Sequence, residues 1–325
     1  MKVNVKTPAR LHFGLIDLNG GLGRIFGGIG VGIEQPNFIL EAEVSEELRV
    51  DGLKKELVEL MARRFLDAYN LKGRFARLNL KQEIPEHVGL GSGTQLALAV
   101  ATSLAKLLNV EASTQELALV MGRARRTGVG TAIFEKGGFV VDGGKHVTDI
   151  TGSSEGFPPV IFHQSFPEDW MFVVAVPNGK PGLSADREVS AFESLSPMPV
   201  EKIGKICRLT MMKLLPALLE HDIENFGEAL TQIQLIVGEQ FAKVQSGIYS
   251  SETVRDGIEL MRKLEVHGLG QSSWGPSFYG LCHNEKEAEK IQLNVQKLLD
   301  ESVGGRVFTA KANNRGAQIR VDAES

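Results

Sequence analysis

The sequence predicts an α+β protein of two domains, on the basis of its length, its composition and its pattern of apolar residues. The chain has 325 residues, which is long for one hydrophobic core. Apolar residues make up 42% and charged residues 23%, as in an ordinary globular protein. Strand and helix patterns alternate in the first half, and long helical patterns are grouped in the second, which indicates α+β architecture with antiparallel sheet. We place the domains at residues 1–160 and 161–325.

The first domain begins with strand patterns at residues 3–5 and 11–15, followed by a glycine-dense segment and a hairpin that extends to residue 50. Ser113 and Glu116 have the spacing of a capping box, which opens a helix. From their apolar periodicity we expect these further elements: a helix over 53–69, a strand over 76–80, a buried helix over 94–108, the capped helix from 113 to about 126, and a strand from 139.

The second domain begins with the apolar run 171–176, which predicts a buried strand. Pro216 lies within a long helical pattern, so we expect it to end or kink that helix. The remaining patterns predict helices over 199–219, 222–245, 252–266 and 285–300, and strands over 276–282, 306–311 and 316–321.

Charge, cysteine content and hydropathy exclude several classes of protein. The net charge is −4, which provides no basic field for a nucleic acid backbone. Cys207 and Cys282 are far apart and form no CxxC pair, so neither a disulfide framework nor a zinc site is indicated. The N-terminus has no signal-peptide pattern, and the most apolar stretch, 96–108, is interrupted by Lys106. We expect a cytoplasmic protein with no nucleic acid or membrane partner.

Glycine is the one unusual number in the composition. The chain has 36 glycines in 325 residues, about 11% against a usual share of about 7%. Of these, 22 fall within four segments, 14–32, 89–93, 122–144 and 268–280. Glycine lets the backbone approach a ligand closely and adopt positive φ. The surplus therefore indicates where the backbone meets a charged ligand.

The strongest motif is the segment 85–95, PEHVGLGSGTQ, which runs directly into the buried helix. A helix N-terminus offers unpaired N–H groups and a partial positive charge, which suit a phosphate or diphosphate. A glycine-rich turn with an ordinary cap is the alternative, and the spacing fits neither a P-loop nor GxGxxG. The expected phosphate-binding residues are Gly89, Gly91, Ser92, Gly93, Thr94 and Gln95.

A second motif, PARLHFGLID, occupies residues 8–17 and is followed by Arg24. If the apolar residues at 11, 13 and 15 face the core, then Arg10, His12 and Asp17 share the other face of the strand. A guanidinium, an imidazole and a carboxylate near a glycine loop would suit an anionic sugar. We take Arg10, His12, Asp17 and Arg24 as catalytic candidates, with a solvated strand face as the alternative.

Two further segments are candidates for ligand contact. Residues 268–279, GLGQSSWGPSFY, combine glycines and hydroxyls around a tryptophan, so Gln271, Ser272, Ser273, Trp274 and Gly275 are candidate substrate-binding residues. A hairpin turn with a core tryptophan is the alternative. Residues 123–144 combine three arginines with Glu135 and Asp142, and here the alternative is a solvated helix end followed by a hairpin.

The order of these motifs resembles the GHMP kinase superfamily, across nearly the whole chain. The resemblance implies an N-terminal domain of the left-handed βαβ type, a C-terminal ferredoxin-like domain, and a site between them. The stretches PARLHFGLIDLNGGLGR, VGLGSGTQLALA, GTAIFEKGGFVVDGG and GLGQSSWGPSFYGL further resemble the β-ribofuranosylaminobenzene 5′-phosphate synthase family of methanopterin biosynthesis. That family joins 5-phosphoribosyl 1-diphosphate to 4-aminobenzoate or 4-hydroxybenzoate, releasing CO₂ and diphosphate.

The resemblance also implies Mg²⁺ as cofactor and a homodimer. Asp17 is the first metal candidate and Glu135 the second, while Arg10 and Arg24 would bind phosphate or carboxylate. Trp274 would pack on the arene, and Gln271 would orient a polar group of the substrate. The segment 127–131 lacks the catalytic Asp of many GHMP kinases, which argues against an ATP-dependent kinase. A non-catalytic binding protein is the third alternative.

Overall fold

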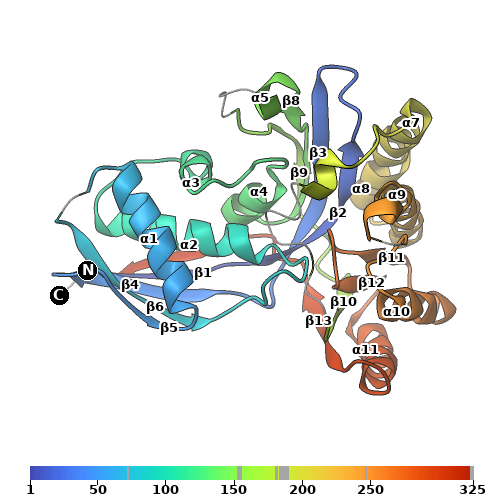
Figure 1. The fold of residues 1–325 in the computed structure, drawn as a ribbon. Coiled ribbons are helices and arrows are strands. Elements are labelled where there is room, and N and C mark those ends of the chain that lie inside the picture. Colours follow the sequence, from blue (N-terminus) through green and yellow to red (C-terminus); the bar gives the residue numbers. More distant parts are fainter. Residues whose placement is uncertain (72, 152–155, 180–181, 183–189, 246, 323–325) are drawn as a thin grey trace.

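The computed structural model describes the chain except for residues 72, 152–155, 180–181, 183–189, 246 and 323–325. A sheet covered by helices forms one side of the molecule, grouped helices on a second sheet form the other, and the long pair β2–β3 lies between them (Figure 1). The expected α+β architecture is confirmed. In the described part of the chain, no helix is long and apolar enough to cross a membrane.

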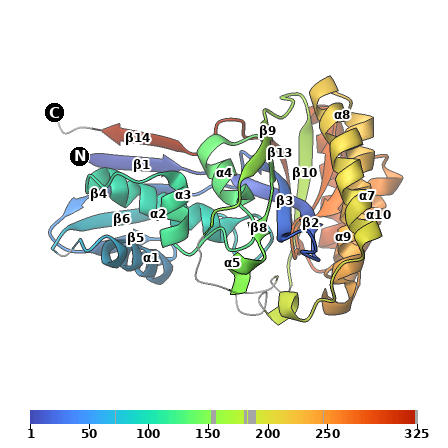
Figure 2. The same ribbon diagram turned by 90° about the horizontal axis from the view of Figure 1, so that it is seen from above.

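The N-terminal sheet contains strands from both ends of the chain. β14 pairs antiparallel with β1, so the two termini lie close together (Figures 1 and 2). β5 and β6 are parallel and are joined through α1, which packs on α2. In order across the sheet, the strands are β14 (Gln318–Asp322), β1 (Lys2–Lys6), β4 (Ile39–Ser45), β6 (Phe75–Gln82) and β5 (Arg49–Gly52), with helices α1 (Lys55–Ala68) and α2 (Ser92–Leu107).

The central sheet carries the strand of the second motif. Its antiparallel order is β2 (Ala9–Asp17), β3 (Arg24–Ile33), β7 (Phe139–Asp142) and β9 (Val160–Gln164), with β8 (Lys145–His146) paired to β3. Three short helices accompany it: α3 (Thr114–Val120), α4 (Val129–Lys136) and α5 (Thr148–Thr151). The capping box of α3 is present, but the prediction that this helix reaches residue 126 is wrong. Gly122, at φ +67°, turns the chain away from the helix.

The C-terminal half contains a β-α-β-β-α-β sheet, which is the ferredoxin-like arrangement that the sequence resemblance implied. α10 and α11 pack on this sheet, while α9 contacts both β11 and β2. In sheet order the strands are β11 (Gly268–Gln271), β12 (Phe278–Cys282), β10 (Met171–Pro177) and β13 (Gly305–Lys311), with helices α9 (Ile223–Gln245), α10 (Glu252–Lys263) and α11 (Glu285–Asp300).

The helical pattern around Pro216 forms a continuous helical run with a change of type. α7 (Val200–Leu209) is followed by the π-helix η1 (Thr210–Leu214) and then by α8 (Leu215–Glu220). Pro216 has no N–H to donate, and it occupies the first turn of α8, where that donor is not needed. The proline therefore does not end the helical run, and it lies in the first turn of α8, directly after the π-helix.

One core of aromatic rings joins the two halves. Phe13 of β2 lies 6.2 Å from Phe139, 6.2 Å from Phe172 and 5.2 Å from Tyr279, measured between ring centroids. Phe139 in turn lies 5.9 Å from Phe226 of α9. Strand β2 is therefore packed from both sides. The boundary at residue 160 stays a prediction, and it coincides with the start of β9.

Asp142 is a fully buried carboxylate that fastens α4 to the central sheet. Its Oδ2 accepts the N–H of Gly128 at 2.9 Å, and its Oδ1 accepts the N–H of Gly144 at 2.8 Å. Burial raises its pKa from 3.8 to about 6, although bonds from Gly144, Gly128, Gly28 and Val129 oppose the shift. The segment 123–127, just before α4, is thereby held in place.

This raised pKa predicts a pH-dependent contribution to stability. Between about pH 4 and about pH 6 the unfolded state releases the Asp142 proton and the folded state keeps it. Stability therefore falls as pH rises through this window, by about 3 kcal/mol at about 1.4 kcal/mol per pKa unit. The measurement is the free energy of unfolding of the protein and of Asp142→Asn, obtained by urea titration at several pH values. We expect the difference, protein minus variant, to fall from pH 4 to pH 6. A difference that is flat or rises with pH would contradict this explanation.

Candidate functional site

The three glycine-bearing motifs of the sequence meet at one place in the structure. Ser272 Oγ donates to the carbonyl of Gly89 at 2.6 Å and accepts the backbone N–H of His12 at 2.9 Å. Arg10 Nη1 donates to the same Gly89 carbonyl at 2.8 Å. The backbone N–H of Ser277 donates to the Val88 carbonyl at 3.1 Å. Strand β2, the loop before α2 and the turn after β11 therefore form a single framework.

Two glycines of the loop are required by close contact. Gly89 has φ +87°, and a Cβ there would lie 2.2 Å from the Ser272 carbonyl oxygen. Gly91, at φ +77°, caps α2, and a Cβ there would lie 2.6 Å from Cγ of Arg10. Any side chain at either position would separate the loop from its partners.

The first cavity, of about 750 Å³, lies over the N-terminus of α2. Gly91, Ser92, Gly93 and Thr94 line it, and the first N–H groups of a helix have no partner within the helix. Lys54 also lines this cavity and pairs with Glu86 at 3.4 Å. Its lining contains the acids Glu56 and Glu86 beside the basic Arg10, Lys54, Lys55 and Arg123. The helix terminus, with basic side chains in excess of acids, gives this cavity the properties of a phosphate or diphosphate site.

The second cavity, of about 310 Å³, adjoins the first, and the two share Arg10, Thr94, Arg123, Ser273 and Trp274. Arginines line one side of it, and the described residues that line it include no Asp or Glu. This side, which we call the arginine side, consists of Arg10, Arg64, Arg123, Arg125 and Arg126. Guanidinium groups bind phosphate and carboxylate with matched planar geometry, so this side suits an anion.

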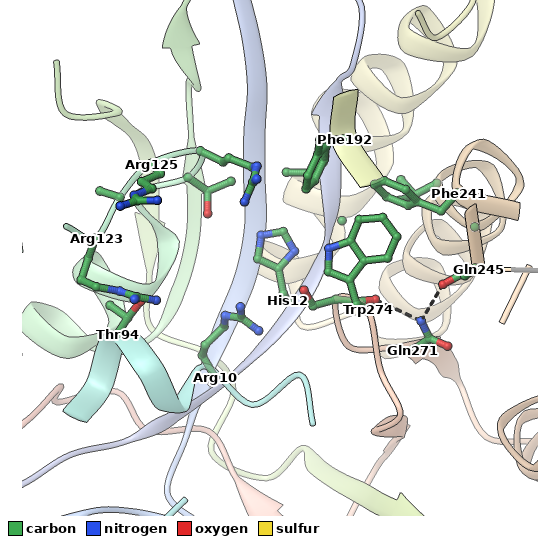
Figure 3. Close-up of a pocket in the computed structure, with 18 of the residues that line it drawn as sticks. Arg10, His12, Thr94, Arg123, Arg125, Phe192, Phe241, Gln245, Gln271 and Trp274 are labelled. Carbon is green, nitrogen blue, oxygen red and sulfur yellow. Dashed lines mark hydrogen bonds between the residues drawn. The ribbon is translucent and has the colours of Figure 1, made fainter. Parts of the chain in front are cut away.

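The opposite side of the second cavity is aromatic (Figure 3). The ring centroids of Phe241 and Trp274 are 4.4 Å apart, and those of Phe192 and Trp274 are 5.4 Å apart. The guanidinium carbon of Arg126 lies 4.2 Å from the centroid of Phe192, a cation–π contact. Figure 3 shows Arg123 and Arg125 on one side of the cavity and Phe192, Phe241 and Trp274 on the other.

His12 lies between the two sides of the second cavity (Figure 3). It is only 7% exposed, and its pKa is well below 6.5, because burial and the neighbouring Arg10 both disfavour the charged form. The imidazole is therefore neutral at pH 7, and one of its ring nitrogens can accept a hydrogen bond.

Five predicted residues line neither cavity: Gln95 and Ser272, which belong to the framework, and Asp17, Arg24 and Glu135. Asp17 Oδ1 accepts the N–H groups of Asn19 at 2.7 Å and of Gly20 at 2.9 Å, which form the turn after β2. Arg24 donates to the carbonyls of Gly143 at 2.8 Å and Gly144 at 2.6 Å. Glu135 lies exposed on α4. The proposed catalytic and metal roles of Asp17, Arg24 and Glu135 stay predictions, but the structure does not bring these three side chains to the cavities.

Other predicted residues hold the framework together. Gln95 is fully buried and donates to the carbonyl of Gly130 at 2.9 Å. Gln271 Oε1 accepts the N–H of Ser250 at 2.7 Å, and its Nε2 donates to the Ser273 carbonyl at 3.1 Å. Ser272 is fully buried. Ser273 and Trp274 line both cavities, and Gly275 lines the first.

The sequence motifs missed much of the second cavity. The signal for Arg123, Arg125 and Arg126 was present in the RARR run, which could be either a solvated helix end or a ligand-binding segment. Phe192 and Phe241 are separated by almost fifty residues, and neither carries a local motif. Phe241 lies on α9 and Phe192 lies outside it, and the two rings meet at the cavity with their centroids 5.7 Å apart.

A protein-only metal centre does not fit these residues. Among the residues that the structure describes, no group of three or more His, Cys, Asp or Glu side chains could hold a metal ion. Mg²⁺ commonly binds through one or two carboxylates together with substrate phosphates. Mg²⁺ bound through a diphosphate would be compatible with this site, and its use stays a prediction.

Comparison with solved structures identifies the fold. The chain superposes on homoserine kinase from Cytophaga hutchinsonii with a TM-score of 0.71 at 17% identity, covering 98% of this chain and 97% of that one. It superposes on L. major mevalonate kinase with a TM-score of 0.70 at 13% identity, covering 94% and 95%. These similarities show the fold alone.

Sequence comparison identifies the family. The GHMP kinases N terminal domain matches residues 55–138, and the GHMP kinases C terminal domain matches residues 214–301. β-Ribofuranosylphenol 5′-phosphate synthases are similar over nearly the whole chain. The protein of Archaeoglobus fulgidus is 35% identical, covering 98% of this chain and all of that one. That of Methanocaldococcus jannaschii is 34% identical, covering 97% and 99%.

The resemblance noted in the sequence is therefore confirmed, as is the prediction of an enzyme of the pentosyltransferase type. The chain belongs to the GHMP kinase superfamily, in the family of the β-ribofuranosylphenol 5′-phosphate synthases.

Proposed function

We propose that the protein joins 5-phosphoribosyl 1-diphosphate to a para-substituted benzoate, with release of CO₂ and diphosphate, as a step of methanopterin biosynthesis. The observation that carries the proposal is the second cavity, where an arginine side without lining acids faces an aromatic side. One substrate carries a phosphate and a diphosphate, and the other carries an aromatic ring and a carboxylate. The two sides of the cavity match these two chemistries.

The border between the two cavities is the natural position for the reacting carbon. A diphosphate at the N-terminus of α2 would lie beside Arg10, Thr94 and Arg123, which line both cavities. C1 of the ribose would then face the second cavity, with its 5′-phosphate toward the arginine side. Fixed N–H dipoles and guanidinium groups stabilise the negative charge that develops on the leaving diphosphate.

The reaction balances without a further reactant. The bond between C1 and the diphosphate oxygen breaks, and its electron pair leaves with the diphosphate. The ring carbon that carries the carboxylate forms the new bond to C1. The bond from that carbon to the carboxylate then breaks, its electrons restore the aromatic ring, and CO₂ leaves. A neutral His12 adds no positive charge beside the cationic ribose. When bound through the diphosphate, Mg²⁺ would neutralise part of the charge of the leaving group.

The para substituent of the acceptor is an amino or a hydroxyl group. The curated relatives are named for a ribofuranosylphenol, which supports a hydroxyl group and hence 4-hydroxybenzoate. The sequence motifs leave both acceptors, 4-aminobenzoate and 4-hydroxybenzoate, open. A homodimer remains a proposal from the family resemblance.

A GHMP-type kinase is the second candidate, and the site gives it less support. A kinase would need to activate an alcohol, and the second cavity has no carboxylate among its described lining residues. Asp142, the nearest buried acid after segment 127–131, is engaged by the N–H groups of Gly128 and Gly144. A non-catalytic binding protein would not need a glycine loop held so closely at Gly89 and Gly91.

The direct test is incubation with 5-phosphoribosyl 1-diphosphate and carboxyl-labelled 4-hydroxybenzoate or 4-aminobenzoate. We expect labelled CO₂ and diphosphate in equal amounts, with faster turnover of the hydroxyl acceptor. Formation of ADP from ATP and a small alcohol, without CO₂ release, would favour the kinase instead.

Arg123→Gln tests the arginine side. Loss of one charged hydrogen bond, worth about 1.5–3 kcal/mol, should raise the KM for 5-phosphoribosyl 1-diphosphate about ten- to hundredfold. Arg63→Gln is the control, because Arg63 lies on the exposed side of α1 and pairs with Glu59 at 2.6 Å. KM is measured by diphosphate release. Equal KM values in the two variants would contradict the proposal that Arg123 binds 5-phosphoribosyl 1-diphosphate.

A further inference from the structure

The aromatic corner, which consists of Phe192, Phe241 and Trp274, differs from the other aromatic clusters of the protein because it borders a cavity. Trp274 lines both cavities, and the two phenylalanines line the second. The other tryptophan, Trp170, is 1% exposed and packs against Phe166 and Phe226 within the core. The aromatic corner therefore offers ring surface that a ligand can reach.

A cation lies at the edge of the aromatic corner. The Arg126 guanidinium is stacked over Phe192, 4.2 Å from its centroid, and Arg126 also lines the cavity. A guanidinium that stacks on an aromatic ring directs its N–H groups outward in its own plane, which is the direction from which a carboxylate binds. Ring surface and a cation are thus adjacent within a cavity of about 310 Å³, at the small end of ligand sites.

The wall beyond the aromatic corner is apolar and closely packed. Leu15, Val237 and Ile248 line it. Gly14 and Gly238 also line this part of the cavity, and a Cβ on Gly14 would lie 3.1 Å from Cγ2 of Val237. The nearby Gln245 and Gln271 amides bond to each other at 3.4 Å. A flat apolar ring fits such a wall better than a hydrated sugar, which would leave hydroxyls without partners.

We propose that the aromatic corner and Arg126 form the acceptor subsite, which binds an aromatic carboxylic acid with its ring on Trp274 and Phe241 and its carboxylate on Arg126. The inference rests on the proposed function, because it assigns the acceptor of that reaction to one part of the cavity. The ring would lie against Trp274, which lines both cavities, so its carboxylate-bearing carbon would be near the border of the cavities, where C1 of the ribose would lie. Neutral CO₂, once formed, has no charge for Arg126 to hold.

The two tryptophans permit a binding test that needs no turnover. The chain has only two, Trp170 and Trp274, so Trp170→Phe leaves Trp274 as the sole fluorescent indole. Benzoate titrated into Trp170→Phe, with and without diphosphate, should produce a saturable change in fluorescence. The change should disappear in Trp274→Phe, which keeps Trp170.

Paired variants separate the carboxylate contact from the ring contact. Arg126→Gln should weaken benzoate about tenfold or more, because it loses a charged hydrogen bond, and should leave benzyl alcohol unchanged. Phe241→Leu should weaken both ligands. Arg306→Gln is the matched control, because Arg306 also lies over a phenylalanine, 5.8 Å from the centroid of Phe308, but lines neither cavity. Circular dichroism of each variant confirms that it is folded.

The outcomes distinguish this inference from the proposed function. Benzoate binding with these variant effects, but without CO₂ release in the catalytic assay, would support the subsite and overturn the proposed reaction. Catalysis with an unchanged acceptor KM in Arg126→Gln and Phe241→Leu would overturn the subsite and leave the reaction standing. Absence of a saturable fluorescence change under both conditions would also overturn the subsite.

Discussion

The contact between Gly89 and the Ser272 turn is the constraint on which the rest of the site depends. The Ser272 hydroxyl joins the Gly89 carbonyl to the His12 N–H, so one side chain connects three segments that are far apart in sequence. A Cβ at Gly89 would lie 2.2 Å from the Ser272 carbonyl oxygen, so only glycine allows this approach. Ser272 is fully buried, so loss of either hydrogen bond would leave a buried polar group without a partner, which is destabilising. The three segments are therefore expected to stay in contact. As a result, the N-terminus of α2 is fixed relative to the turn after β11, which contains both Ser272 and Trp274.

Electrostatics is the second determinant of the site. Five arginines line a small cavity that has no acid among its described lining residues. A lining of this charge favours a polyanionic ligand. Asp142, the nearby buried acid, is directed at the backbone of Gly128 and Gly144 instead. Asp142 therefore helps to hold the segment 123–127 in place without pairing with its arginines.

Much of the fold could be predicted from local patterns. The capping box at Ser113 and the apolar periodicity of the long helices are local signals, and the structure confirms both. The end of α3 at Val120 was missed, because the positive φ of Gly122 outweighs an otherwise helical pattern. The return of β14 to β1 could not be predicted, because strand pairing across the whole chain leaves no local signature.

The site was predictable where its residues lie within local motifs. Gly89, Gly91 and Trp274 lie in glycine-rich motifs, and they line the cavities as those motifs suggested. Asp17 and Arg24 belong to the same stretch as Arg10 and His12, but the direction of a side chain at a strand end depends on its turn. Phe192 and Phe241 are far apart in sequence and meet only through tertiary packing, with their ring centroids 5.7 Å apart.

In the proposed reaction, one pair of adjoining cavities holds the leaving diphosphate and the aromatic acid side by side. A crystal structure of the protein with diphosphate and benzoate tests this arrangement most directly. We predict diphosphate at the N–H groups of Ser92 and Gly93, and benzoate against Trp274 with its carboxylate at Arg126. Diphosphate bound away from α2, or benzoate outside the second cavity, would contradict the account.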